Sequence, residues 1–198
     1  MAISRFSTSR VGAGLPKYQK FWDGSTVYTP PSFYSIQTAT VDSGGASTIT
    51  FSSIPSTYTH LQIRMIARGT YAGNLVSFNM QINGETGSFY SSHHLGGDGS
   101  SAYAYAGTSA TNIDLNDIAS ANNTANCFSV FVLDILDYAS TNKYKTTRGL
   151  LGRDFNGSGQ LELNSGLYQK TTAISSITFN VGANNFGQYT QFALYGVK

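Results

Sequence analysis

The sequence has a single cysteine and few charged residues, and each shortage argues against a class of protein. Charged residues make up 11% of the 198 residues, against about a quarter in typical proteins. The formal net charge is only +2, so we expect no nucleic-acid partner, which would need clustered Lys and Arg. Cys127 cannot form an intrachain disulfide, and its place in an apolar run predicts a small core residue rather than a nucleophile.

Long apolar runs are also absent. No stretch approaches the length of about 20 residues that spans a bilayer, so we expect no membrane insertion. Residues 1–28 lack the apolar segment of a secretory signal, which predicts folding in the cytoplasm of the cell that makes the protein. Release inside a particle would still carry such a protein out of that cell.

Short strands at regular spacing, separated by Gly, Ser, Asn and Asp, take the place of helices. Leu61, Ile63 and Met65 alternate with mainly polar neighbours, which is typical of a strand with one wet face. Similar strands are expected at residues 35–41, 46–51, 74–83, 160–168, 174–181 and 189–197. We therefore expect an all-β fold for residues 32–198, a jelly-roll-like β-sandwich of roughly eight to eleven strands.

Residues 127–153 contain the most apolar stretch of the chain. Its two faces would be lined by Phe131, Leu133 and Ile135 on one side, and by Phe128, Val130 and Val132 on the other. Because both faces are apolar, we expect a strand buried on both sides. Polar residues 139–142 predict a turn into a wetter strand at 143–148. A helix is the alternative, but strong helix formers are scarce here.

Residues 1–31 differ from the rest of the chain, because their apolar residues follow neither a helical nor a strand period over any length. Basic residues, small residues and an aromatic cluster precede Pro30 and Pro31, which favour an extended conformation. We interpret the segment as an extended arm that docks on a partner, with a first strand of the domain as the alternative. The expected anchoring residues are Arg5, Arg10, Tyr18, Phe21 and Trp22.

Residues 84–125 are the least regular part, and we expect short strands and long loops there. Long loops on a β scaffold usually carry the binding surface. Tyr rings stack on sugars, and Asn and Tyr polar groups form hydrogen bonds, although contacts between subunits use the same residues. The candidate binding residues are Tyr90, His93, His94, Tyr103 and Tyr105.

Two polar clusters contain residue types found in metal or catalytic sites, but the spacing of these residues does not fit such a site. His93 and His94, near Asp98, could hold a metal or catalyse proton transfer, but adjacent strand residues point to opposite faces. Residues 154–165 match part of a calcium loop, yet Ser165 stands where a bidentate Glu is required, so a Gly-rich hairpin turn is expected. We therefore predict no catalytic, metal or cofactor-binding residues.

Four segments resemble a family of virion structural proteins of tailed bacteriophages, common in phages of cyanobacteria and other aquatic bacteria. They read SRFSTSRVGAGLPKYQKFWDG in the arm, then HLQIRMIARG, LDILDYASTNKYKT and FALYGVK. The arm is similar to the openings of otherwise different virion proteins, which implies an anchoring module. The resemblance implies a place in the virion, assembly in the host cytoplasm and other virion proteins as partners. It supplies no catalytic residues.

Three functions fit this resemblance. The first is a non-enzymatic tail-fibre or tail-tip adhesin that contacts host surface polysaccharide. The second is a capsid decoration (cement) protein that stabilises the head, and in both cases we expect a homo-oligomer, by analogy a trimer. The third is a carbohydrate-active enzyme on the same β-sandwich, which would need converging carboxylates among Asp98, Asp114 and Asp154.

Overall fold

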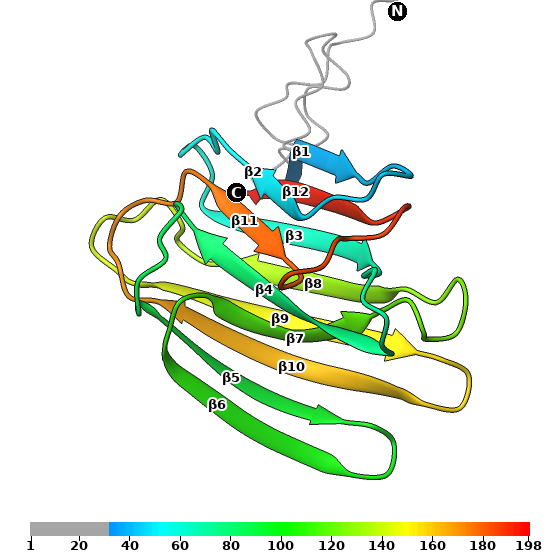
Figure 1. The fold of residues 1–198 in the computed structure, drawn as a ribbon. Helices are drawn as coiled ribbons and strands as arrows, with labels where there is room; N and C mark the ends of the chain where they lie inside the picture. Colours follow the sequence, from blue (N-terminus) through cyan, green and yellow to red (C-terminus); the bar gives the residue numbers. More distant parts are fainter. Residues whose placement is uncertain (1–31) are drawn as a thin grey trace, which may run out of the picture. The chain divides into compact units, whose positions relative to one another are not determined.

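Two antiparallel β-sheets face each other across an apolar core in the structure, a computed structural model that describes residues 32–198 (Figure 1). The larger sheet has the order β1-β12-β3-β8-β9-β10-β5-β6, and the smaller β2-β11-β4-β7. The strands are β1 (Phe33–Thr40), β2 (Thr48–Phe51), β3 (His60–Ala67), β4 (Leu75–Ile82), β5 (Tyr90–Gly97), β6 (Ala102–Ala110), β7 (Ile113–Ala119), β8 (Ser129–Ile135), β9 (Lys145–Asp154), β10 (Gly159–Tyr168), β11 (Ile177–Asn180) and β12 (Gln191–Val197). The predicted all-β sandwich is thereby confirmed.

Eight of the twelve strands have the order of a jelly roll. When β5, β6, β9 and β10 are set aside, the rest form two four-stranded sheets, β1-β12-β3-β8 and β2-β11-β4-β7. Numbered along the chain, these sheets run first-eighth-third-sixth and second-seventh-fourth-fifth, which is the jelly-roll arrangement. The other four strands are therefore two hairpins inserted into a jelly-roll frame.

The inserted hairpins extend the larger sheet beyond the frame. Hairpin β9–β10 pairs with β8, and hairpin β5–β6 pairs in turn with β10. In Figure 1 these strands continue the sheet on the side away from β1, and β6 is its last strand. Of the smaller sheet, β7 lies against β5, β9 and β10. The junction of β7 with the hairpins is thus where frame and insertions meet.

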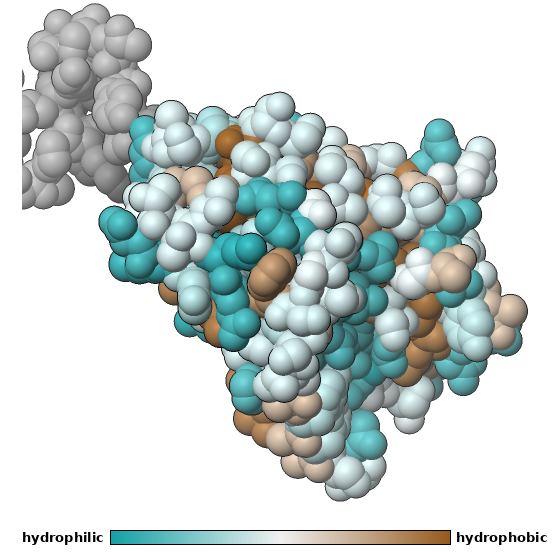
Figure 2. Space-filling model, turned by 60° about the vertical axis from the view of Figure 1, so that its left-hand side comes forward, coloured by the Kyte–Doolittle hydropathy of each residue, from teal (hydrophilic) through white to brown (hydrophobic). Residues whose placement is uncertain are grey.

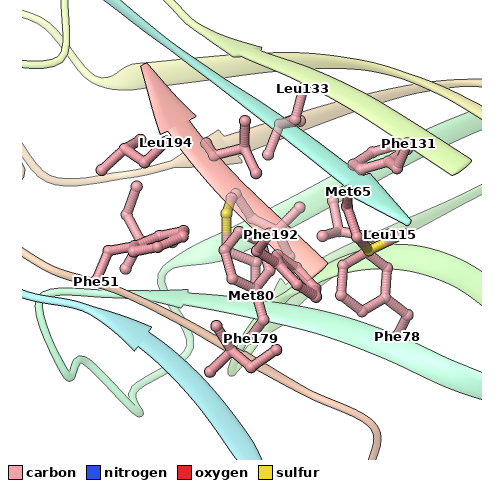
Figure 3. Packing of buried hydrophobic residues seen from close by; sticks show 14 of the residues in the cluster. Phe51, Met65, Phe78, Met80, Leu115, Phe131, Leu133, Phe179, Phe192 and Leu194 are labelled. Atoms are coloured by element: carbon pink, nitrogen blue, oxygen red, sulfur yellow. The ribbon is translucent and has the colours of Figure 1, made fainter. Parts of the chain in front are cut away.

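Aromatic side chains fill the space between the two sheets of the frame. Phe78 of β4 belongs to this group (Figure 3) and stacks on Phe179 with ring centroids 5.7 Å apart. It also meets the rings of Phe131, Phe186 and Phe192 at steep angles, with centroids 6.0 to 6.3 Å away. These contacts join both sheets, because Phe131 and Phe192 belong to the larger one.

The expectation that the strand at 127–153 is buried on both faces is wrong. In β8, Phe131, Leu133 and Ile135 face the core, whereas Val130 and Val132 on the other face are 52% and 41% exposed. A two-layer sandwich covers only one face of each sheet, so alternate residues of β8 point outward. The expected core position of Cys127 is also corrected, since this residue precedes β8 and is only half-buried.

Residues 84–125 form regular strands rather than long loops. Strands β5, β6 and β7 contain seven to nine residues each, and only residues 98–101 and 111–112 separate them. Small residues hid the pattern, because in a strand such as Ala102–Ala110 (AYAYAGTSA) apolar and polar positions barely differ in hydropathy. This stretch brings the strands to twelve, against the expected eight to eleven.

The face of residues 32–198 that Figure 2 shows is mainly polar. In the view of Figure 2 most side chains are pale or teal, and brown side chains occur in separate spots. Residues 32–198 include no helix that could span a membrane. The predicted arm, residues 1–31, with Arg5, Arg10, Tyr18, Phe21 and Trp22, lies outside the described residues.

The aromatic core predicts a large difference between two Phe→Ala substitutions. Phe78→Ala should lower the free energy of unfolding by about 3–5 kcal/mol, because it leaves a cavity among four rings. Phe33→Ala, at a residue 40% exposed, should cost less than about 1 kcal/mol. Urea unfolding of the two variants measures both values. Equal losses would show that Phe78 is not central to the core.

Candidate functional site

The inserted hairpins carry polar side chains on the face that meets β7. On β5, His94 points inward and is buried, whereas His93 points outward and is exposed, as the strand geometry predicts. On β10, Glu162 and Asn164 also point inward. The inner face of the extension therefore differs from the aromatic core of the frame and is the most polar buried region among residues 32–198.

Glu162 is the centre of this region. Its side chain is completely buried, and a buried carboxylate is costly unless each oxygen is hydrogen-bonded. Here Oε1 lies 2.6 Å from Nδ1 of His94, and Oε2 accepts a hydrogen bond of 2.6 Å from the Tyr103 hydroxyl. The Asn116 side-chain amide donates to the same Oε2. One carboxylate thus fixes side chains from β5, β6 and β7.

Two tyrosines of β6 form an aromatic shelf above this carboxylate, and we use that name for Tyr103 and Tyr105. The Tyr105 ring stacks on the His94 imidazole with centroids 4.1 Å apart and planes at 8°. Tyr103 follows at 6.3 Å and 19° from Tyr105. Tyr105 remains 42% exposed. Its ring is therefore held by a buried neighbour while offering surface to solvent.

Carboxylates of β7 border the aromatic shelf. Asp114 Oδ2 lies 3.8 Å from His94 Nε2, and the Asp114 side chain is 44% exposed. Between Asp114 and Asp117 the pairing with β4 shifts register, and Asn116 has a positive φ of 68°. Such a bulge re-aims side chains. It turns the Asn116 amide toward Glu162 and leaves both aspartates half-exposed.

The phenols of the shelf have raised pKa values. Burial raises the pKa of Tyr103, and its hydrogen bond to the Glu162 carboxylate raises it further. Burial also raises the pKa of Tyr105, helped by the negative charges of Asp114 and Glu162. Arg153 is the cation nearby, and its guanidinium donates to the Asp117 carbonyl. Three carboxylates against one guanidinium make the surroundings of the shelf negative.

The described residues offer no set of ligands for a metal ion. Among residues 32–198, no group of three or more His, Cys, Asp or Glu is placed to hold a metal. Glu162 lies beneath the shelf, fully occupied by its three donors. Asp98 and Asp154 cap turns instead: Asp98 accepts from the Ser100 amide, and Asp154 from the Asn156 amide.

The turn at residues 154–159 is the predicted Gly-rich hairpin turn. It joins β9 to β10, and the Phe155 amide donates to the Ser158 carbonyl at 2.8 Å. Gly157, with a φ of 117°, adopts a conformation that glycine tolerates without strain. The partial calcium-loop pattern is thus explained by a tight turn.

The five predicted binding residues separate into three groups. His94, Tyr103 and Tyr105 come together around Glu162, although they lie on strands and not on loops. His93 lies on the opposite, outward face of β5. Tyr90 is completely buried, and its hydroxyl bonds the backbone of Ile82, so the expectation of a surface contact there is corrected.

Sequence reasoning missed Glu162, Asn116 and Asp114 as one site with His94. One signal was present, since Glu162 and Asn164 alternate with Leu161 and Leu163. The usual interpretation of such a strand puts leucines inside and polar residues outside. The structure has the reverse.

Comparisons of the chain with protein-family models, with curated proteins and with solved structures found no match. The chemistry of the site therefore has to be inferred from its geometry.

Gly96 makes room for the aromatic shelf, which predicts a selective effect of an added methyl group. Gly96 pairs with Tyr103 across the hairpin, and a Cβ at this position would overlap the Tyr103 phenol. Gly96→Ala should cost about 1–3 kcal/mol of unfolding free energy and change the near-UV circular dichroism of tyrosine. Gly107→Ala, in the same hairpin with open space around it, is the control and should change stability by less than about 0.5 kcal/mol.

The raised phenol pKa values predict a loss of stability at alkaline pH. Burial raises the pKa of Tyr168 to about 12, and those of Tyr103 and Tyr105 are raised as well. The unfolded chain, with phenol pKa values of about 10, loses these protons first. Their contribution should therefore be complete below about pH 10 and decline as the pH rises toward the folded-state values. Urea unfolding at several alkaline pH values tests this, and Tyr103→Phe should make the decline shallower; an unchanged decline would contradict the raised pKa of that phenol.

Proposed function

We propose that the protein is a non-enzymatic carbohydrate-binding protein and that the aromatic shelf is its sugar contact. The observation that carries the proposal is the state of Tyr105, whose ring is half-exposed yet stacked at 4.1 Å on a buried imidazole. A ring held in this way loses little conformational entropy when a ligand covers it. Preorganised aromatic faces of this kind suit the apolar face of a sugar ring.

The carboxylates beside the shelf supply the polar half of such a contact. Asp114 and Asp117 are half-exposed at its border and can accept hydrogen bonds from sugar hydroxyls. Tyrosine rings next to carboxylate acceptors match the usual composition of ligand sites. In such sites apolar contact holds the molecule and a few polar groups fix its orientation. Hydrolysis is a less favoured function, because Asp98 and Asp154 each accept backbone amides in a turn and Glu162 is held by three donors.

The charge of the site favours neutral or amino sugars. Asp114, Asp117 and Glu162 all contribute negative charge near Tyr105; burial is the main cause of the raised pKa of this phenol, and these charges raise it further. An acidic sugar placed on the shelf would meet like charge, whereas an amino group would meet opposite charge. Host polysaccharides rich in hexose or amino sugar are thus the favoured ligands.

The resemblance to phage virion proteins supports a role for this sugar binding in host attachment. In this proposal the chain is a tail-fibre or tail-tip adhesin, anchored to the particle through residues 1–31 and binding the host surface with its inserted hairpins. The aromatic shelf belongs to those hairpins and not to the jelly-roll frame, which supports a specialised role for them.

Substitution of Tyr105 tests the sugar contact. Purified protein should bind a panel of neutral and amino-sugar polysaccharides from candidate hosts, and Tyr105→Ala should weaken binding at least about tenfold, since one stacking contact is lost. Tyr144→Ala is the matched control, because Tyr144 is 55% exposed on the loop before β9. Equal binding by wild type and Tyr105→Ala would overturn the proposed contact.

The virion location needs a separate measurement. Gold-labelled antibody against the protein should mark the tails of purified phage particles. Label over the head would favour the decoration protein, and particles without label would remove the virion assignment while leaving sugar binding to be judged by the Tyr105 series.

A further inference from the structure

The outward face of the larger sheet carries a contiguous apolar strip. Seven aliphatic residues, each between 41% and 61% exposed, are neighbours in the strand register of β3, β8, β9, β10 and β5. They are Ile66, Val130, Val132, Leu150, Leu161, Leu163 and Leu95, and we call this set the outer strip. Isolated exposed apolar residues are normal, but a contiguous set of this size marks an interaction surface.

Two cross-strand rows make up the outer strip. In one row Ile66 pairs with Val130, and Gly152 separates Val130 from Leu161. In the other, Val132, Leu150, Leu163 and Leu95 are successive neighbours across four strands. None of these pairings has a register shift, so the surface is regular and follows the sheet.

The border of the outer strip is polar. In the next row, Arg148 donates to Asp134 at 2.9 Å, and the Gln62 amide donates to the same aspartate at 2.9 Å. At the opposite border, an open hollow of about 730 Å³ is lined by Val130 and Leu161, by several glycines of the hairpin ends, and by the charged residues Asp98, Arg153 and Asp154. An apolar centre with a polar rim is the usual anatomy of a protein–protein interface.

From this surface we infer that copies of this chain associate through the outer strip, with the strip of one copy packed against that of another. At roughly 100 Å² for each half-exposed aliphatic residue, the strip presents on the order of 700 Å². A stable interface needs about 800 Å² on each partner, which the polar rim completes.

A second copy fits the charge and shape of the outer strip. The strip contains no charged side chain, and in the next row Asp134 and Arg148 neutralise each other, so the centre of the surface offers no charge that a second copy would have to bury. Regular sheet faces also pack on one another at about 10 Å with interdigitating side chains. The same face on both partners is what a self-complementary interface requires.

The strands themselves indicate that this face is made to be covered. On β10, Leu161 and Leu163 point outward although Glu162 and Asn164 occupy the inside. Leucines at these positions serve no core within residues 32–198, where they are 61% and 54% exposed. Burial against a second copy would remove both from water.

Sedimentation equilibrium of the full chain tests the inference. The wild type should be a dimer at micromolar concentration, not the trimer expected by analogy, because a self-complementary interface pairs two copies. Leu163→Lys should raise the dissociation constant about thirtyfold or more, because it puts a charge in the centre of the strip. Leu136→Lys is the matched control: Leu136 is 46% exposed but follows the end of β8, outside the outer strip, and its substitution should leave association unchanged. Circular dichroism should show the same fold for all three proteins, since both leucines point outward.

Two results would overturn the inference. One is a Leu163→Lys variant that associates as strongly as the wild type. The other is a monomeric wild type. In that case the fluorescence of Trp22, the only tryptophan, distinguishes the two other partners that could cover the strip, the chain's own arm and a different protein. If Leu163→Lys shifts that emission to the red, the strip is covered by the chain's own arm; if the emission is unchanged, the strip serves a different protein. Sugar binding by the aromatic shelf lies on the inner face and is judged separately.

Discussion

The burial of one carboxylate governs the part of this molecule that lies outside the jelly-roll frame. Glu162 sits between the sheets, where an unpaired charge would cost several kcal/mol, and its donors come from three other strands. Hairpins β5–β6 and β9–β10 and strand β7 are thereby held together by a single group. Substituting Glu162 would release the imidazole on which Tyr105 stacks, so the geometry of the surface ring depends on a completely buried carboxylate.

The middle of β10, in an inserted hairpin, has its polarity reversed relative to the frame. In the frame, β3 and β8 bury large apolar residues against the smaller sheet, and their outer faces are mixed. In the middle of β10, Glu162 and Asn164 point inward and Leu161 and Leu163 point outward. The reason lies in the layers: at β7 the inserted strands meet the aspartates at the edge of the smaller sheet, not an aromatic core. The same strands therefore carry a polar site on one face and an apolar surface on the other.

Sequence reasoning succeeds where a strand has one apolar and one polar face. Residues 60–68, 74–83 and 189–197 were predicted as strands because their alternate residues enter the core, and β3, β4 and β12 confirm them. Sequence reasoning fails at residues 84–125, because the many Ala, Gly and Ser residues there leave little difference in hydropathy between the two faces of a strand. The site was beyond its reach for another reason: the partners of Glu162 lie 46 to 68 residues away along the chain, and only strand register brings them together. The exposed face of β8 was missed because no pattern within one strand reveals whether a second layer covers it.

Both hairpins enter between frame strands that are consecutive in the jelly roll, one between β4 and β7 and the other between β8 and β11. Each joins the sheet by adding to its free edge, so no pairing within the frame is interrupted. Either hairpin could therefore be lengthened, replaced or exchanged in evolution while the eight strands of the frame kept their pairing and their aromatic core. Rapid diversification of binding specificity, with a conserved interior, is the evolutionary pattern that such an architecture permits.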